Sequence, residues 1–219
     1  DGDFAGRDAY FKTHKNYQIE DYKAAIKEGD IPKDYKVYWG HEDKVLYERA
    51  KKNLKKLSKE DKPFNLTMLT VDTHFPNGYI CDLCDNKYDT TYGNAVACAD
   101  RQVYDFVQWI KQQDFYEDTT IIIAGDHTSM VDTGSKFWKS LGNNYQRTVY
   151  NAIINPQCSY KKKVTTERKF STMDMFPTTL AALGVQIDGN KLGLGTNLFS
   201  GEKTLREQLG ANYINKELK

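Results

Sequence analysis

An aspartate and a histidine stand side by side at the end of the most hydrophobic strand that the sequence predicts. The run Thr119–Ala124 (TTIIIA) is followed at once by the tripeptide Gly-Asp-His. Ligands of open α/β sheets bind at the carboxyl ends of the strands, and a glycine there lets the backbone turn without a side-chain clash. A carboxylate beside an imidazole suits zinc or manganese. We therefore predict Asp126 and His127 as metal ligands; the alternative is a solvated turn.

A second polar cluster follows another predicted strand, Phe64–Thr70, and reads Asp72-Thr73-His74. His74 can donate a proton or hydrogen-bond a phosphoryl oxygen, which makes it a candidate catalytic and substrate-binding residue. The alternative is a histidine in an ordinary polar loop. Asp72 is expected to form a turn through its own side chain at the strand end.

The chain has four cysteines, of which Cys81, Cys84 and Cys98 are crowded together while Cys158 stands alone. A zinc site would favour two close ligand pairs, whereas Cys158 has no neighbouring cysteine. A redox CxxC usually opens a helix after a strand, whereas CDLCDNKYD resembles a loop. A disulfide in an oxidising compartment is favoured, with free thiols as the next alternative. We predict that Cys98 pairs with Cys81 or Cys84, preferably Cys84.

Hydrophobic spacing predicts the elements that must position these residues. Apolar residues recur at helical intervals in EDKVLYERAKKNLKKLSKED, where the lysines form the solvated face. The expected helices are two within 8–28, then 42–61, 94–113, 171–184 and 203–210, and the expected strands are 64–70, 119–124 and 147–156.

Two further residues favour structural roles. Asp174 follows Ser171 and Thr172, where a cap or a first-turn acid stabilises a helix. Trp39, in VYWGHED, is expected to pack in the core, with a place under a substrate groove as the alternative.

The order of the predicted strands and helices favours an α/β fold with a mostly parallel sheet and helices on both faces. The unbroken Thr-Ile run of the strand over 119–124 predicts burial on both of its faces. The 219 residues suit one sizeable core, and we predict a single, incomplete domain over 1–219.

Composition excludes some classes of protein. The formal net charge is +1, so no broad field attracts nucleic acid or an anionic membrane. No run approaches the roughly 18–20 apolar residues that span a bilayer, and no signal peptide is visible. Because the chain opens at Asp1 without a Met, we expect a piece or cleavage product whose anchor or export signal would lie upstream. The 15 tyrosines would suit sugars and glycerol, although half-buried packing is equally expected.

Several motifs together resemble one family. TVDTH, GDH after a hydrophobic run, and STMDMFPTTLAALG followed by GLGTNLFS occur here in the order found in bacterial phosphoglycerol transferases and lipoteichoic acid synthases. FAGRD and RTVYNAIIN are also similar to that family, so the resemblance runs from Asp3 to about Leu209. It implies an alkaline phosphatase/sulfatase-like fold lacking its N-terminal part.

The resemblance also implies a site. The family holds a divalent metal, expected here as Mn or Zn, through an early Glu, a Thr nucleophile and an Asp-His pair that matches Asp126 and His127. It places His74 against the substrate phosphate or glycerol. Arg7 would hold a phosphate oxygen, a task that suits its planar fork. In lipoteichoic acid synthases a Trp lies two residues before this Arg, and Ala5 departs from that pattern.

The implied reaction is a two-step phosphoryl transfer outside the bacterial cell membrane. A metal-activated Thr attacks phosphatidylglycerol and releases diacylglycerol, and a glycan or teichoic acid hydroxyl then takes the phosphoglycerol. No Thr of this chain stands in the expected turn after an early strand. We therefore expect residues 1–219 to lack the nucleophile and to be inactive alone, with membrane attachment through upstream segments.

Other functions stay open. A sulfatase would need a Cys or Ser converted to formylglycine near the start of the domain, which this chain does not contain. A phosphoethanolamine transferase tends to carry further histidines after the Asp-His pair, and TSMVDTGSKFW has none. A phosphonate hydrolase is a third alternative. A non-catalytic module that binds glycans or lipid headgroups is the alternative from another class.

Overall fold

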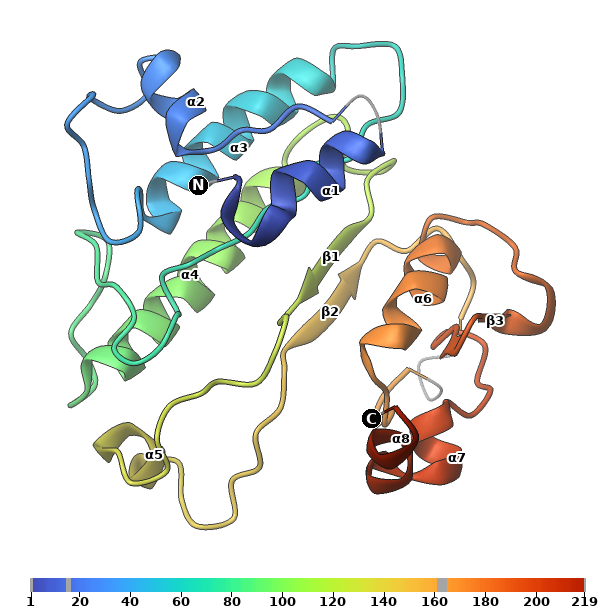
Figure 1. The fold of residues 1–219 in the computed structure, drawn as a ribbon. Coiled ribbons are helices and arrows are strands. Elements are labelled where there is room, and N and C mark those ends of the chain that lie inside the picture. The colour runs from blue at the N-terminus through green and yellow to red at the C-terminus, as the bar shows by residue number, and fades with distance from the viewer. Residues whose placement is uncertain (1, 15–16, 161–164, 219) are drawn as a thin grey trace. The chain divides into compact units, whose positions relative to one another are not determined.

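The computed structural model describes residues 2–14, 17–160 and 165–218 (Figure 1). The chain forms two compact units. The first comprises Asp1–Gln112 and Ser129–Arg147, and the second comprises Gln113–Thr128 and Thr148–Lys219.

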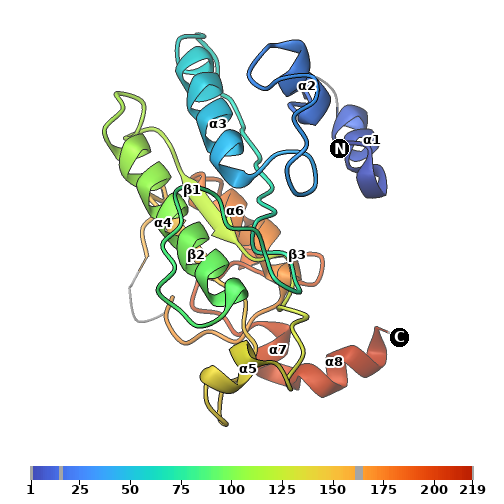
Figure 2. The same cartoon turned by 90° about the vertical axis from the view of Figure 1, so that its left-hand side faces the viewer.

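Two long helices form the centre of the first unit. α3 (Asp43–Leu57) and α4 (Thr91–Lys111) lie side by side in both views (Figures 1 and 2), as their predicted amphipathic patterns require. Their apolar faces meet where the rings of Tyr47 and Phe106 approach to 5.1 Å between centroids. The other buried apolar residues of these helices are Ala50, Leu54, Tyr92, Ala95, Cys98, Val107 and Ile110.

Shorter helices complete the first unit. A single 3-10 turn, η1 (Phe4–Gly6), leads into α1 (Arg7–Thr13), and α2 (Tyr22–Lys27) follows. α1 and α2 confirm the two short helices predicted within 8–28. A further helix, α5 (Lys136–Ser140), was not predicted; Ser135 caps its N-terminus by accepting a hydrogen bond from the Trp138 amide.

The second unit contains two small antiparallel sheets. β1 (Ile121–Ala124) pairs with β2 (Asn151–Ile154), and β3 (Lys191–Leu192) pairs with β4 (Gly195–Thr196). The register sets Ala124, the last residue of β1, opposite Asn151, the first residue of β2. The segment between the two strands therefore leaves and re-enters the sheet at the same end.

Helices make up the rest of the second unit. A 3-10 turn, η3 (Thr172–Asp174), leads into α6 (Met175–Ala182), and the helix stops where Gly184 adopts a left-handed φ of +83°. The others are η4 (Asp188–Asn190), α7 (Leu205–Leu209) and α8 (Ala211–Glu217), the last of which was not predicted. Across the described residues, no helix is both long and apolar enough to pass through a bilayer.

The mostly parallel sheet is not confirmed, because both sheets of the described residues are two-stranded and antiparallel. A parallel pair needs a crossover that carries the chain back to the starting end of the first strand. The segment between β1 and β2 makes no such crossover. The predicted burial of β1 on both faces is also wrong, since its residues are half-buried or exposed.

The predicted strand over 64–70 does not pair with any described strand. Its residues alternate between half-buried and exposed from Phe64 to Leu69, as expected for an extended segment with one covered face. An extended segment becomes a strand only when a neighbour completes its ladder of hydrogen bonds.

Candidate functional site

The predicted metal ligands directly follow β1. The Gly125 amide donates to the Tyr150 carbonyl at 2.9 Å, which extends the β1–β2 ladder by one bond before the chain turns away. His127 Nε2 then lies 3.7 Å from Asp126 Oδ2. Both side chains are exposed, His127 by 54% and Asp126 by 70%, so an incoming ion can reach them.

The pair fits one part of a metal shell. Bonds of about 2 Å from an ion to each atom are compatible with the separation of the imidazole nitrogen and the carboxylate oxygen. His127 Nδ1 lies 2.9 Å from the Thr128 carbonyl, which favours a proton on Nδ1 and leaves the lone pair of Nε2 for the ion. Within the described part of the second unit, no third Cys, His, Asp or Glu joins the pair.

His74 lies in a closed turn of the first unit. Its amide donates to the Val71 carbonyl, and its carbonyl accepts hydrogen bonds from the Gly78 amide and from the Tyr38 hydroxyl. Its Nδ1 lies 2.8 Å from the Phe75 carbonyl. This contact favours a proton on Nδ1 and leaves Nε2 as the atom that can accept a proton or a hydrogen bond from a substrate.

An aromatic residue covers one side of His74. The Trp39 ring lies 4.1 Å from the imidazole between centroids and stacks on Tyr38 at 5.5 Å. Trp39 is 55% exposed, so the prediction that it packs in the core is wrong. A tight turn presents it outward: Val37 and Gly40 exchange backbone hydrogen bonds, and Tyr38 is held at a left-handed φ of +52°.

Two buried carboxylates hold the start of the His74 turn. Asp43, the first residue of α3, accepts hydrogen bonds from the Val71 and Asp72 amides at 2.8 and 3.2 Å. Asp72 in return accepts from the Asp43 amide at 3.1 Å. Burial, and then the neighbouring carboxylate of Asp43, raise the pKa of Asp72 to about 7. Asp72 Oδ2 thus binds a distant amide, and Asp72 Oδ1 has no partner among the described residues. Asp72 is a buried anchor, and the prediction that it forms a turn through its own side chain is wrong.

Arg7 is exposed at the start of α1. Its guanidinium lies 5.1 Å from the centroid of the Phe4 ring. The two residues before it, Ala5 and Gly6, have left-handed φ angles of +54° and +73°, which turns the chain sharply into the helix. Arg7 and His74 make no hydrogen bond with each other among the described residues, although both belong to the first unit.

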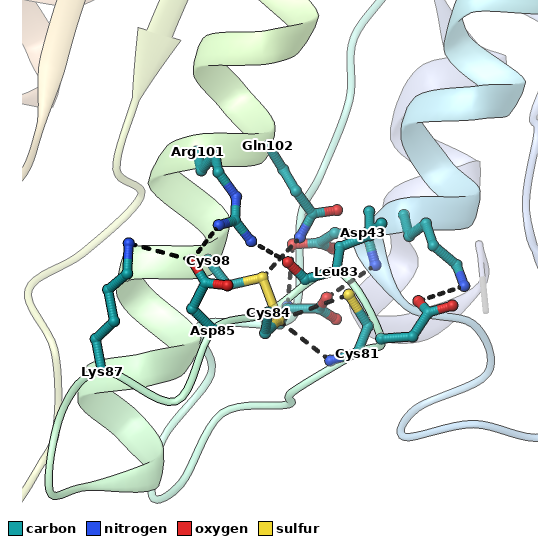
Figure 3. The surroundings of a disulfide bond; sticks show 12 residues. Asp43, Cys81, Leu83, Cys84, Asp85, Lys87, Cys98, Arg101 and Gln102 are labelled. Atoms are coloured by element: carbon teal, nitrogen blue, oxygen red, sulfur yellow. Dashed lines mark hydrogen bonds and ion pairs between the residues drawn. A yellow bond between two sulfur atoms is a disulfide. The ribbon is translucent and has the colours of Figure 1, made fainter.

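Three cysteines gather against α4 (Figure 3). Cys84 and Cys98 form a disulfide, the pair preferred from the sequence, with a Cα–Cα distance of 5.1 Å. Cys81 is a buried free thiol whose sulfur lies 3.6 Å from that of Cys84. Burial raises the pKa of the Cys81 thiol. Cys158 is also free.

Asp174 has the structural role predicted for it. It forms a reciprocal capping box with Ser171 and accepts a hydrogen bond from the Thr196 amide at 2.8 Å. Since it is 2% exposed, it is not available to a ligand.

The structure therefore brings together Asp126 and His127 in the second unit, and it places His74 and Arg7 in the first. Sequence reasoning missed the Tyr38 hydroxyl, which donates to the His74 carbonyl, and the buried Asp43, which holds the start of the turn that carries His74. Asp43 and Asp72 are 29 residues apart, so no local pattern marks them as a pair.

Comparison with known proteins identifies similar sequences. The family model described as Sulfatase matches residues 2–185. Curated relatives named "Phosphoglycerol transferase I" from Shigella flexneri and Salmonella choleraesuis (strain SC-B67) are 32% and 31% identical over 208 residues. The match covers 91% of this chain and 26% of either relative, so the chain spans about a quarter of their length. No solved structure matches.

Proposed function

Because the chain belongs to the sulfatase family, we propose that it forms part of a metal-dependent phosphoglycerol transferase that works outside the bacterial cell membrane. The resemblance to phosphoglycerol transferases that the motifs predicted is confirmed by relatives of that name. The donor would be phosphatidylglycerol, and the acceptor would be a hydroxyl of a glycan or teichoic acid.

The observation that carries this proposal is the exposed pair of Asp126 and His127. Its nitrogen and oxygen ligand atoms lie 3.7 Å apart at the end of a strand, with the other imidazole nitrogen held by a carbonyl. A divalent ion bound there, Mn or Zn, would supply positive charge against the phosphate and lower the pKa of a bound hydroxyl. Asp126 and His127 would hold that ion.

His74 would contact the substrate. With Nδ1 directed to the Phe75 carbonyl, its Nε2 can accept a hydrogen bond from a glycerol hydroxyl or, when protonated, donate one to a phosphoryl oxygen. Trp39 and the Tyr38 hydroxyl restrict the turn that carries it. A fixed imidazole loses little entropy on binding, which favours precise placement of a phosphate.

Arg7 would provide a second contact to the phosphate. Its guanidinium can donate two parallel hydrogen bonds to phosphate oxygens, which a lysine cannot match. The exposed position at the start of α1 leaves those donors accessible.

We further propose that the nucleophilic Thr is not among residues 1–219. The family mechanism needs a Thr in a turn after an early strand, and the described residues before Lys36 form helices and loops. Thr13 is the last residue of α1 and donates to the Tyr10 carbonyl. Thr128 follows the metal pair too closely to be directed back at it.

The experiment is a transfer assay on the complete protein that contains this chain. Radiolabelled phosphatidylglycerol is the donor, a glycan is the acceptor, and His74→Ala is compared with His14→Ala, an exposed histidine of the same unit. We expect loss of transfer by about 100-fold or more in His74→Ala, the usual contribution of a positioned acid or base, and wild-type transfer in His14→Ala. Equal transfer by both variants would remove His74 from the reaction.

A further inference from the structure

Three cysteine sulfurs lie together at α4, although only two of them form the disulfide. The sulfurs of Cys81, Cys84 and Cys98 all lie within 4.8 Å of one another, and those of Cys81 and Cys84 are 3.6 Å apart (Figure 3). Cys81 and Cys98 are buried, at 7% and 3% exposure. The disulfide uses only two of the three sulfurs, so it does not explain why the Cys81 thiol is buried beside it.

We propose that reduction of the Cys84–Cys98 disulfide creates a binding site for a thiophilic divalent ion of the zinc type, with Cys81, Cys84 and Cys98 as its ligands. The proposal concerns a different place from the Asp126–His127 pair and does not depend on the transferase function.

The spacing of the sulfurs matches such an ion. With zinc–sulfur bonds of about 2.3 Å and tetrahedral angles, two sulfur ligands stand about 3.8 Å apart. Cys81 and Cys84 already have nearly this separation, because they flank a turn in which the Cys84 amide donates to the Cys81 carbonyl at 3.1 Å. This is the two-residue ligand spacing that zinc sites commonly use.

Hydrogen-bond donors already face two of the sulfurs. The Cys81 amide donates to Cys84 Sγ at 3.3 Å, and Gln102 Nε2 donates to Cys98 Sγ at 3.7 Å. Donors in this position stabilise thiolate charge around a metal. The same side chain offers a place for a fourth ligand: Gln102 is 7% exposed, and its Oε1 has no hydrogen-bond partner among the described residues. A water on the ion would donate to that oxygen.

The surrounding contacts do not depend on the disulfide. Arg101, on α4, donates to Asp85 at 2.6 Å and to the Leu83 carbonyl (Figure 3). Lys44, on α3, donates to Asp82 at 2.7 Å. These bonds tie the segment between Cys81 and Asp85 to both helices, so the three sulfurs stay close when the disulfide opens.

The chemistry balances with a dithiol as the reductant. The dithiol passes two electrons to the Cys84–Cys98 bond, gives its two protons to the sulfurs and becomes a disulfide itself. The ion then replaces the protons of the three thiols, which are released to water. A disulfide reverses the exchange: it takes two electrons from the Cys84 and Cys98 thiolates, takes up two protons from water and becomes a dithiol, while the Cys84–Cys98 bond re-forms and the ion is released. Disulfide and metal are therefore alternative links between the loop after His74 and α4.

Cobalt(II) serves as the probe, because thiolate ligands give it a charge-transfer band that oxygen and nitrogen ligands do not. Residues 1–219 are titrated with cobalt after reduction by a phosphine, and again in the oxidised form. We expect one equivalent to produce the band in the reduced protein and no band in the oxidised protein. A reduced wild-type protein without the band would overturn the proposal, whatever the variants do.

Two serine variants locate the site. Cys81→Ser removes a ligand without touching the disulfide, whereas Cys158→Ser removes the other free thiol, which belongs to the second unit. We expect Cys81→Ser to weaken cobalt binding by about 100-fold or more. Replacing a residue that only hydrogen-bonds to a metal ligand already lowers metal affinity by about 10–100-fold, and Cys81 is itself a ligand. Cys158→Ser should bind as the wild type does. Unchanged binding in Cys81→Ser would exclude the three-sulfur site.

Discussion

Asp43 and Asp72 each bind the backbone amide of the other: Asp43 Oδ2 accepts from the Asp72 amide at 3.2 Å, and Asp72 Oδ2 accepts from the Asp43 amide at 3.1 Å. The exchange joins the first turn of α3 to the turn that carries His74. Asp72 Oδ1 has no partner among the described residues, which leaves one carboxylate oxygen buried and unsatisfied. An unsatisfied buried carboxylate is most costly when it is ionised.

Replacing Asp72 should therefore change how stability depends on pH. Its pKa of about 7 in the folded protein lies above its ordinary value near 4, so the folded state holds the extra proton between those values. The contribution of Asp72 to stability is then full below about pH 4 and is lost as the pH rises to about 7. Asp72→Asn should abolish this loss.

Urea unfolding at a series of pH values measures the effect. We expect Asp72→Asn to be more stable than the wild type above about pH 7, by on the order of 1–4 kcal/mol, and to converge with it near pH 4. Asp89→Asn, which changes a carboxylate that is 88% exposed, should follow the wild-type profile. Parallel profiles for Asp72→Asn and the wild type would show that Asp72 is not the titrating group.

The disulfide should stabilise the first unit. Cys84 and Cys98 are 14 residues apart, and closing a loop of this length contributes about 3 kcal/mol through the entropy of the unfolded chain. The double variant Cys84→Ser/Cys98→Ser should lose about that amount in denaturant unfolding. Cys158→Ser should lose little, since Cys158 is a free thiol.

Mass spectrometry of unreduced peptides tests the pairing itself. We expect a linked peptide pair that contains Cys84 and Cys98, together with alkylated Cys81 and Cys158. A linked pair that contains Cys81 would mean that the sulfurs pair differently from the structure.

Asn155 should be needed at the end of β2. It adopts a left-handed φ of +54°, and its Nδ2 donates to the carbonyls of Tyr116, Glu117 and Thr119 at 2.9, 3.1 and 3.1 Å. Asn155→Ala loses these bonds and strains the backbone, so we expect a loss of about 2–3 kcal/mol in unfolding free energy.

Glycine at this position separates the two causes. Asn155→Gly loses the same side-chain bonds but tolerates the left-handed backbone, so it should be about 1 kcal/mol more stable than Asn155→Ala. If the two variants unfold at the same denaturant concentration, backbone strain makes no contribution at this site.

The ion pair between Arg168 and Glu207 predicts a pH dependence of the opposite sign. A hydrogen bond from Arg168, whose Nε lies 2.7 Å from Glu207 Oε1, lowers the pKa of Glu207 to about 2. The stabilisation is full above the ordinary pKa of about 4.3 and is lost as the pH falls through about 2. Glu207→Gln should lack this acid-dependent loss, of order 1–3 kcal/mol, whereas Glu202→Gln, which changes an exposed carboxylate, should keep it.

The sequence predicted those helices and strands that are specified by residues close together in the chain. The helix over 42–61 was expected from apolar spacing and is observed as α3, and the helix over 94–113 is observed as α4, which begins after the Thr90 cap. β1 and β2 were also expected, within the strands predicted over 119–124 and 147–156. The spacing of apolar residues specifies these elements because it depends only on residues within the same segment.

Pairing between distant segments could not be predicted in the same way. A strand over 64–70 was expected from the composition of that segment. A hydrogen-bond ladder also needs a neighbouring strand, and the composition of one segment does not identify its neighbour. The contact of Trp39 with His74 likewise depends on a turn at Tyr38 with a left-handed φ, a conformation that a tyrosine does not signal. The candidate site residues were predicted by type and motif, and the side chains that contact them are visible only in the structure.

The central claim is that Asp126 and His127 hold the catalytic ion, and diacylglycerol release from phosphatidylglycerol tests it most directly. The assay compares the complete protein, its Asp126→Ala variant and an Asp188→Ala control, which changes an exposed carboxylate of the same unit. Metal content is measured on the same samples, and residues 1–219 are assayed alone with added manganese or zinc. We expect release and bound metal in the wild type and the control, loss of both in Asp126→Ala, and no release by residues 1–219. Normal release and retained metal in Asp126→Ala would contradict the assignment of the site, and turnover by residues 1–219 would show that the nucleophile lies within them.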